Sequence, residues 1–291
     1  LTITGGVSVA DFNTIADKTT GTITATISDT TAAALVGITE TGHNISIDIG
    51  DTGVLAADLV TIDSKSILPI DATAVTAITG TDTQITAAYA ANTAGTITGL
   101  GNESLTVTNA LTVAEANAIR GLTTNPITAT ISAGNLTGAG NLTALADDNG
   151  NPDVNAYTIT VTDTTATAAQ LTALSARTTV AVNASAVTTI TGTVAECDAA
   201  LDENAAGTIT GIGDVNVNFS GNIGMAALIT LDGLTTGLIT GATNVVATSL
   251  LIADNGATPP VNTGLVSGHA IAITVDETTD GGAHTVAASD L

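Results

Sequence analysis

The sequence predicts a repeat β-solenoid, in which parallel strands alternate with short helical segments in coils of about 22–30 residues. Three observations predict it. Short β-branched segments alternate with Ala-rich segments, one long stretch recurs 112 positions later, and aromatic residues make up only 1% of the chain. A compact core of this size normally uses large aromatic side chains, whereas a thin core of stacked coils has no room for them. We therefore expect one continuous domain over residues 1–291.

The repeat is clearest in two phrases, "AVTAITGT" at 74–81 and "AVTTITGT" at 186–193, which agree at seven of eight positions. The match extends without a gap, so that 45–101 aligns with 157–213, and about two aligned positions in five are identical. We expect this super-repeat to contain four coils and to place equivalent apolar residues in the core. The positions expected to be buried are Ile47, Leu59, Val75, Ile78 and Ile97, with their partners Ile159, Leu171, Val187, Ile190 and Ile209.

The strands are predicted from segments that alternate β-branched residues with Thr, Ala or Asn. In chain order they are "TITATIS" from Thr22, "NISIDI" from Asn44, "SLTVT" from Ser104, "PITATIS" from Pro126, "YTITVT" from Tyr157, "TTVAV" from Thr178, "VNVNF" from Val215 and "AIAITV" from Ala270. Thr on the outer face of such strands suits β geometry and can form hydrogen bonds along the stack.

The helical segments are predicted from Ala-rich runs with apolar residues at i, i+3 and i+4. These runs are 8–17, 31–38, 55–62, 84–91, 112–120, 166–174, 193–201, 225–231 and 247–254. Ser8, Thr112 and Thr193 each stand three residues before a carboxylate, which is the spacing of a capping box at a helix start. The glycines of "ITGT" and "TITGLG" are expected at corners that need positive φ or a close backbone approach.

The charge balance excludes two classes of partner. The chain has 27 acidic and 4 basic residues, with a formal net charge of −23. Binding to nucleic acid or to an anionic membrane surface needs clustered Lys and Arg, so we expect neither. Thr, Asp or Gly interrupts every apolar run before it reaches the length of a transmembrane helix. An acidic chain of this kind suits a secreted or saline setting.

No catalytic pattern stands out. The sequence has no Ser-His-Asp spacing, P-loop, dinucleotide fingerprint or Cys/His metal cluster. Cys197 aligns with Ile85 and is expected to be a buried apolar residue. Glycan-active enzymes use aromatic platforms and basic residues, and this chain has few of either. We therefore predict that the chain is not an enzyme.

Calcium is the one ligand that the sequence suggests. Asp147, Asp148 and Asp153 lie in an Asn- and Asp-rich loop, "ADDNGNPDVN" from Ala146, and a similar loop begins at Ala253. A polar surface turn explains the same composition. An Asp-Thr step also recurs at Asp29, Asp51 and Asp163, at the ends of predicted strands. These carboxylates either bind calcium or cap the helix that follows.

The style of the sequence, with phrases such as "VNASAVTTITGT" from Val182, resembles the Thr/Ala/Gly-rich repeat regions of very large secreted bacterial surface proteins. Adhesins, surface-layer proteins and giant cyanobacterial cell-surface proteins are of this kind. The resemblance implies an extracellular structural role and carries no functional residues over to this chain.

Three functions remain open at this stage. The first is a structural, filament-forming or surface-layer segment, which assembles end to end or laterally with copies of itself or with the continuing chain. The second is an adhesin stalk or phage-fibre module that binds a receptor through the two Asp/Asn/Gly-rich loops, and the third is a glycan-active enzyme. The first segment, "LTIT", and the last, "HTVAASDL", show no capping pattern. We therefore expect the ends to contact another copy or further chain.

Overall fold

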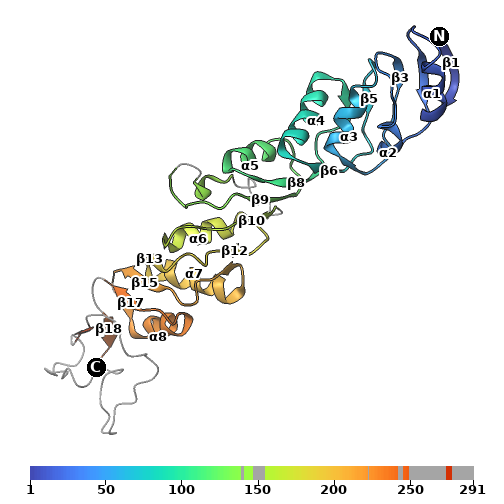
Figure 1. Ribbon diagram of the computed structural model, residues 1–291. Helices are drawn as coiled ribbons and strands as arrows, with labels where there is room; N and C mark the ends of the chain where they lie inside the picture. The colour runs from blue at the N-terminus through green and yellow to red at the C-terminus, as the bar shows by residue number, and fades with distance from the viewer. Residues whose placement is uncertain (139–140, 147–154, 222, 242–244, 249–272, 277–291) are drawn as a thin grey trace. The chain divides into compact units, whose positions relative to one another are not determined.

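The computed structural model describes residues 1–138, 141–146, 155–221, 223–241, 245–248 and 273–276 (Figure 1). These residues group into two compact units. The first unit takes residues 1–132 and 145–158, and the second takes 133–144 with the described residues from Ile159 onward. The prediction of one continuous domain over 1–291 stays a prediction, because the last part of the chain lies largely outside the described residues.

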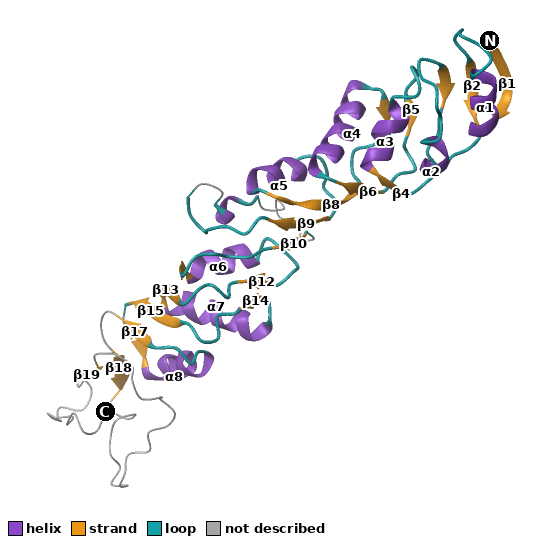
Figure 2. Cartoon of the chain, viewed as in Figure 1, coloured by secondary structure: helices purple, strands orange, loops and turns teal. Residues whose placement is uncertain are grey.

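The prediction of a repeat β-solenoid is wrong. The described residues form a mixed α/β structure with eight α-helices and several short parallel sheets, and no closed barrel or solenoid is detected among them (Figure 2). The physical reason lies in the Ala-rich segments. Those predicted over 84–91 and 193–201 fold as helices of 13 residues, longer than the short segments expected, and a helix is the usual crossover between parallel strands. The strands are correspondingly short and fall into separate sheets.

The first unit contains fifteen described elements. They are β1 (Thr2–Val7), α1 (Val9–Ala16), β2 (Thr24–Ile27), α2 (Ala32–Leu35), β3 (Asn44–Ser46), β4 (Gly53–Leu55), α3 (Ala56–Asp63), β5 (Ile70–Asp71), β6 (Ala77–Gly80), α4 (Asp82–Ala94), β7 (Ile97–Thr98), β8 (Ser104–Leu111), α5 (Val113–Arg120), β9 (Ile127–Ile131) and β10 (Ala156–Thr158). Their sheets have the orders β1-β2-β3, β4-β6-β8-β9-β10 and β5-β7. In Figure 2, α3, α4 and α5 lie side by side along the strands of the second of these sheets.

The second unit contains the remaining described elements. They are the 3-10 helix η1 (Leu142–Ala144), β11 (Thr165–Thr167), α6 (Ala168–Ser175), β12 (Val182–Asn183), β13 (Thr189–Thr193), α7 (Val194–Ala206), β14 (Ile209–Thr210), β15 (Asn216–Ser220), β16 (Ile223–Gly224), α8 (Met225–Leu234), β17 (Ile239–Gly241), β18 (Val245–Thr248) and β19 (Ile273–Asp276). The sheet orders are β11-β13-β15-β17, β12-β14 and β16-β18-β19, and every described pairing in both units is parallel.

Equivalent elements recur at the constant spacing of the super-repeat. Helix α3 begins at Ala56 and α6 at Ala168, α4 begins at Asp82 and α7 at Val194, and both members of each pair have equal length. The spacing also extends beyond the aligned sequence: β9 begins at Ile127 and β17 at Ile239. The two copies of the super-repeat therefore fold into the same succession of strands and helices, even beyond the aligned stretches 45–101 and 157–213.

Both cores are built from small aliphatic side chains. All ten positions predicted to be buried are at most 4% exposed, which confirms the predicted burial. The pattern alternates along the strands, as in β9, where Ile127, Ala129 and Ile131 are buried and Thr128 and Thr130 are exposed. The apolar side of each strand thus packs inward and its Thr side chains face solvent.

Most of the predicted helices and caps are confirmed. Thr112 and Thr193 form complete capping boxes with Glu115 and Glu196, and the Ser8 hydroxyl accepts from the Asp11 N–H. Two further boxes, Thr81 with Gln84 and Thr167 with Gln170, use glutamine instead of a carboxylate. The helix predicted over 247–254 is wrong at its start, because Ala247 and Thr248 belong to strand β18. The rest of that segment lies outside the described residues.

The repeated phrase has two kinds of glycine. Gly99 and Gly211 of the "TITG" phrase have φ of 95° and 90°. A Cβ on Gly99 would lie 2.6 Å from the backbone N of Thr73, so only glycine fits that corner. Gly80 of "ITGT" has no positive φ, and a Cβ there would lie 2.9 Å from the Cβ of Ala56. The expected close approach is therefore present at both glycines, and the expected positive φ at only one of them.

Candidate functional site

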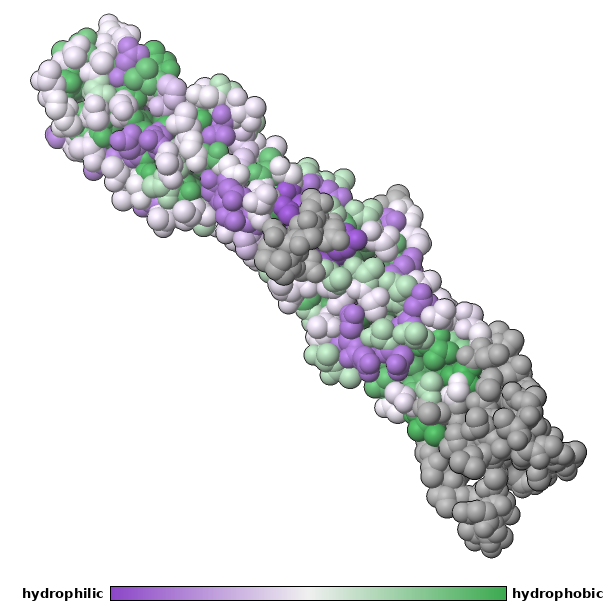
Figure 3. Space-filling view, turned by 180° about the vertical axis from the view of Figure 1, so that it is seen from behind, coloured by the Kyte–Doolittle hydropathy of each residue, from purple (hydrophilic) through white to green (hydrophobic). Residues whose placement is uncertain are grey.

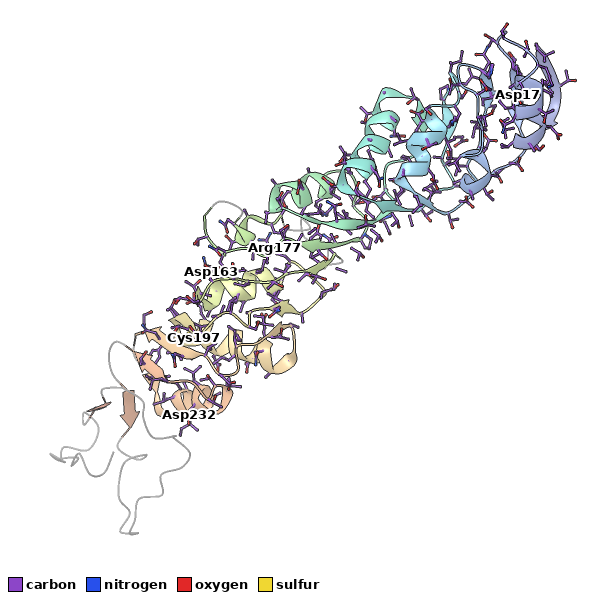
Figure 4. The ribbon with its side chains drawn as sticks, viewed as in Figure 1. Asp17, Asp163, Arg177, Cys197 and Asp232 are labelled. Carbon is purple, nitrogen blue, oxygen red and sulfur yellow. The ribbon has the colours of Figure 1, made fainter. Side chains whose placement is uncertain are left out.

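Three of the six acidic residues proposed as calcium ligands, Asp29, Asp51 and Asp163, accept hydrogen bonds from backbone N–H groups. Asp29 Oδ2 accepts from the Val9 N–H at 2.7 Å, and Asp51 Oδ2 accepts from the Ala32 N–H at 2.7 Å. Asp163, labelled in Figure 4, accepts from the Leu136 N–H at 2.6 Å. Val9 and Ala32 are the first residues of α1 and α2, so Asp29 and Asp51 stabilise helix starts.

The direction of this capping differs from the one expected from the sequence. Asp29 and Asp51 cap a helix that precedes them in the chain by 20 and 19 residues, not the helix that follows. Asn109 does the same for α4, since its Oδ1 accepts from the Asp82 N–H at 3.0 Å. Each such side chain stands after or within a strand and reaches back to the preceding strand–helix unit. The hydrogen bond therefore connects two successive strand–helix segments of the same compact unit.

The three described candidates, Asp29, Asp51 and Asp163, form no metal-binding cluster. The described residues contain no group of three or more His, Cys, Asp or Glu side chains that could hold a metal ion. Asp29, Asp51 and Asp163 lie at separate strand ends, each on its own backbone partner. Asp147, Asp148 and Asp153 lie outside the described residues.

Cys197 is fully buried in α7, as predicted from its alignment with Ile85 (Figure 4). Burial raises the pKa of its thiol to about 11, and the negative charge of Glu196 acts in the same direction. The thiol therefore stays protonated at neutral pH, which is the state of a packing residue.

The most regular polar arrangement of the second unit is the outer face of the sheet β11-β13-β15-β17. Parallel pairing sets Thr165 beside Thr189 and Thr189 beside Asn216. A second row holds Thr167, Thr191, Asn218 and Thr240 in the same way. We call these seven side chains the second polar face. The residues between the two rows, Ala166, Ile190 and Val217, are buried, so the rows point away from the core.

The first unit carries a comparable face on the sheet β4-β6-β8-β9-β10. Thr79 pairs with Thr106, Thr106 with Thr128, and Thr130 with Thr158. Thr106, Thr128, Thr130 and Thr158 are exposed. Together with Thr79 and Ser104 they form the first polar face. Neighbouring side chains in such a row are about 4.8 Å apart, because the strand spacing sets their distance.

Neither polar face contains a charged residue. The strands of β1-β2-β3, β4-β6-β8-β9-β10 and β11-β13-β15-β17 include no Asp, Glu, Lys or Arg at all, in a chain that has 27 acidic residues. The acidic residues of the described chain lie instead on helices and loops, with Asp71 of β5 and Asp276 of β19 as exceptions. Figure 3 shows hydrophilic patches separated by pale surface of intermediate hydropathy, to which Thr and Ser belong. The outer strands thus present a neutral, polar surface.

Threonine hydroxyls also link successive strand–helix units through backbone carbonyls. Thr98 Oγ1 donates to the Ile70 carbonyl at 3.0 Å, and Thr210, its equivalent in the super-repeat, donates to the Val182 carbonyl at 3.2 Å. Thr240 of the second polar face donates to the Val217 carbonyl at 3.2 Å. Such bonds fix the side-chain rotamers and satisfy the hydroxyl donors. Within the second polar face, the Thr240 side chain is held in this way.

Among the described strands, β1 lies at the edge of its sheet. It is the terminal strand of β1-β2-β3, and no described strand pairs with its other side. The Leu1 carbonyl accepts from the Thr24 N–H at 2.8 Å, so the backbone of Leu1 points toward β2. Because peptide groups alternate along a strand, the N–H and C=O of Thr2 point toward the open edge. An unpaired edge of this kind is a template for another strand.

Comparison with protein-family models, curated proteins and solved structures found no match to this chain. Among the described helices, none combines the length and the apolar character needed to cross a membrane.

Proposed function

We propose that this chain is a structural segment of an extracellular bacterial protein, and that it serves assembly and spacing rather than catalysis. The observation that supports this proposal most directly is the unpaired edge of β1. This strand belongs to the sheet β1-β2-β3, whose strands contain no charged side chain. Charged side chains on edge strands are a common protection against strand addition, and β1 has none. A protein built from repeated strand–helix segments can be extended by adding further copies of the same segment, which suits a structural role.

The proposed partner is an edge strand of another copy of this chain, or of the continuing chain, which adds to β1. The contact would reproduce the parallel pairing that already joins β1 to β2 and β2 to β3 inside the first unit. When two copies contact each other through two different surfaces, one free surface of each kind remains at the ends of the pair. Further copies can bind there, so the assembly grows unless it closes into a ring. The net charge of −23 opposes close approach of two copies, and salt reduces this repulsion.

Sedimentation velocity over a range of protein concentrations at about 0.15 M salt tests the proposal. We expect the wild-type chain to form larger species as its concentration rises. Thr2→Pro removes the outward N–H, and it should shift the protein toward monomer. Thr2→Val keeps this N–H and the side-chain size, so it serves as the matched control and should associate like the wild type.

A second candidate function is adhesion to an uncharged partner through the polar faces. The absence of charge on both faces favours this candidate, because charged residues are depleted in the centre of interfaces. The two Asp/Asn/Gly-rich loops expected to bind a receptor lie mostly outside the described residues. Asn218→Lys places a charge on the exposed second polar face and should abolish adhesion without affecting self-association. Loss of self-association instead would assign the face to contacts between copies.

A further inference from the structure

His43 is a buried histidine that supports a backbone N–H of the preceding strand segment. Its side chain is 8% exposed, and its Nδ1 accepts from the Ile23 N–H at 3.2 Å. Ile23 is fully buried and stands next to β2. The ring also contacts Phe12 of α1 edge to face, with ring centroids 5.6 Å apart. His43 therefore joins β2, α1 and the segment that leads into β3.

The equivalent position in the second half of the super-repeat makes the same kind of hydrogen bond with a side chain that does not titrate. Asn155 follows His43 at the offset that relates Ile159 to Ile47, and it also precedes the first residue of a strand, β10. Its Oδ1 accepts from the Ile127 N–H at 2.9 Å, and its side chain is 1% exposed. The structural requirement at this position is therefore a buried acceptor. Asn155 meets that requirement at any pH, whereas His43 meets it only while Nδ1 carries no proton.

We propose that His43 makes the joint between β2 and β3 sensitive to acid. An unperturbed histidine side chain changes its charge between about pH 5 and 8. In the protonated ring both nitrogens are donors, so Nδ1 can no longer accept from the Ile23 N–H. Protonation then leaves this N–H without its acceptor and places a positive charge beside Phe12 in a buried site. The strands β1 and β2 lose part of their attachment to the rest of the first unit.

The neighbouring charged groups offer the protonated ring no hydrogen-bonded compensation. The segments around His43 carry Asp11 and Asp17 on and after α1, Lys18 in the next turn, the exposed Glu40 three residues before the ring, and Lys65 before the Ser66 bridge. Asp11, Asp17 and Lys18 are exposed and Lys65 is half-buried. Among the described residues, the hydrogen bonds of the His43 ring and backbone go to Ile23, Ser66 and Ile67, and none of these is charged.

Hydrogen exchange of the wild-type amides at pH 7.5 and at pH 5, corrected for the pH dependence of the chemical step, tests the proposal. We expect the protection of the Ile23 amide to fall by about tenfold at the lower pH. The protection of the Ile127 amide, which depends on Asn155, should stay the same and provides an internal control.

Two variants that exchange the residue types of His43 and Asn155 test the proposal in both directions. His43→Asn should remove the acid sensitivity of the Ile23 amide, and Asn155→His should give the same sensitivity to the Ile127 amide. The second variant keeps the test valid if the first does not fold. Equal protection of Ile23 at both pH values in the wild type, or an undiminished fall in His43→Asn, would overturn the proposal. The exchange measurement uses monomer conditions, so its result does not depend on self-association through β1.

Discussion

The Tyr89 hydroxyl donates a hydrogen bond to Oε2 of Glu103, and both side chains are buried. Burial, followed by the contact with Glu103, raises the pKa of Tyr89 above its ordinary value. The Gly101 N–H donates to the same carboxylate at 3.0 Å. The corresponding positions of the second half of the super-repeat hold Leu201 and Val215, which are also buried. The first half of the super-repeat thus places a polar pair at these two positions, and the second half places an apolar pair at the equivalent positions.

This pair leads to a double-mutant prediction. Glu103→Val leaves the buried Tyr89 hydroxyl without its acceptor and should lower the free energy of unfolding by about 1–3 kcal/mol. The double variant Tyr89→Leu/Glu103→Val copies the Leu201–Val215 pair and should lose less than the two single variants added together. Urea unfolding of the four proteins measures this coupling, and strict additivity would contradict it.

Helix α3 should gain stability from the cap that its counterpart already has. Thr167 forms a capping box with Gln170 at the start of α6, whereas Leu55 at the start of α3 offers no side-chain cap. Leu55 is 52% exposed, so its replacement removes little packing. Leu55→Thr combined with Asp58→Gln should raise the free energy of unfolding by about 0.5–2 kcal/mol. Thr167→Leu in α6 is the reverse control, and it should destabilise by a similar amount.

The carboxylate of Asp51 should act as a hydrogen-bond acceptor whose charge is dispensable. Asn109 performs the same task at the start of α4 with an amide oxygen. Asp51→Asn should therefore change the free energy of unfolding by less than about 0.5 kcal/mol, and Asp51→Ala should lower it by about 1 kcal/mol. Thermal unfolding of both variants, with and without calcium, measures the difference. A large loss in Asp51→Asn that calcium influences would show that the site uses the charge.

Cys197 predicts a loss of stability at alkaline pH. Its pKa in the folded chain is about 11, above its ordinary value of 9.0. Below pH 9.0 both states keep the proton, and between these two values the unfolded chain releases it first. The contribution of Cys197 to stability is therefore complete below the lower value and is lost as the pH rises toward the higher one.

Chemical unfolding between pH 8 and pH 11 measures this loss. Cys197→Ile copies Ile85, its counterpart in the first unit, and should show a smaller decline than the wild type over this range. Parallel declines of the two proteins would show that other groups, such as Tyr89, account for the whole effect.

Local sequence patterns predicted the core and the helix starts well. The burial of Ile78 in β6 and of Ile190 in β13 was predictable because alternation in a strand depends only on neighbours along the chain. The capping boxes at Thr112 and Thr193 were found for the same reason, since both bonds lie within four residues.

Contacts between distant residues were not predictable in this way. The bond from Val9 to Asp29 spans 20 residues, and nothing in the spacing of the Asp-Thr steps shows that they reach back to an earlier helix. The fold class was missed because the Ala-rich segments were expected to be short helical parts of a solenoid coil, such as 84–91 and 193–201, and α4 and α7 instead run for 13 residues each. The equivalent roles of His43 and Asn155 required the structure, since the two residue types differ and share only an acceptor atom.

Electron microscopy of the isolated chain at high concentration tests assembly through the edge strand β1. We expect particles joined through repeated contacts in the wild type and in Thr2→Val, and single particles in Thr2→Pro. Uniform single particles of the wild-type chain at every concentration, with β1 protected from hydrogen exchange, would contradict it.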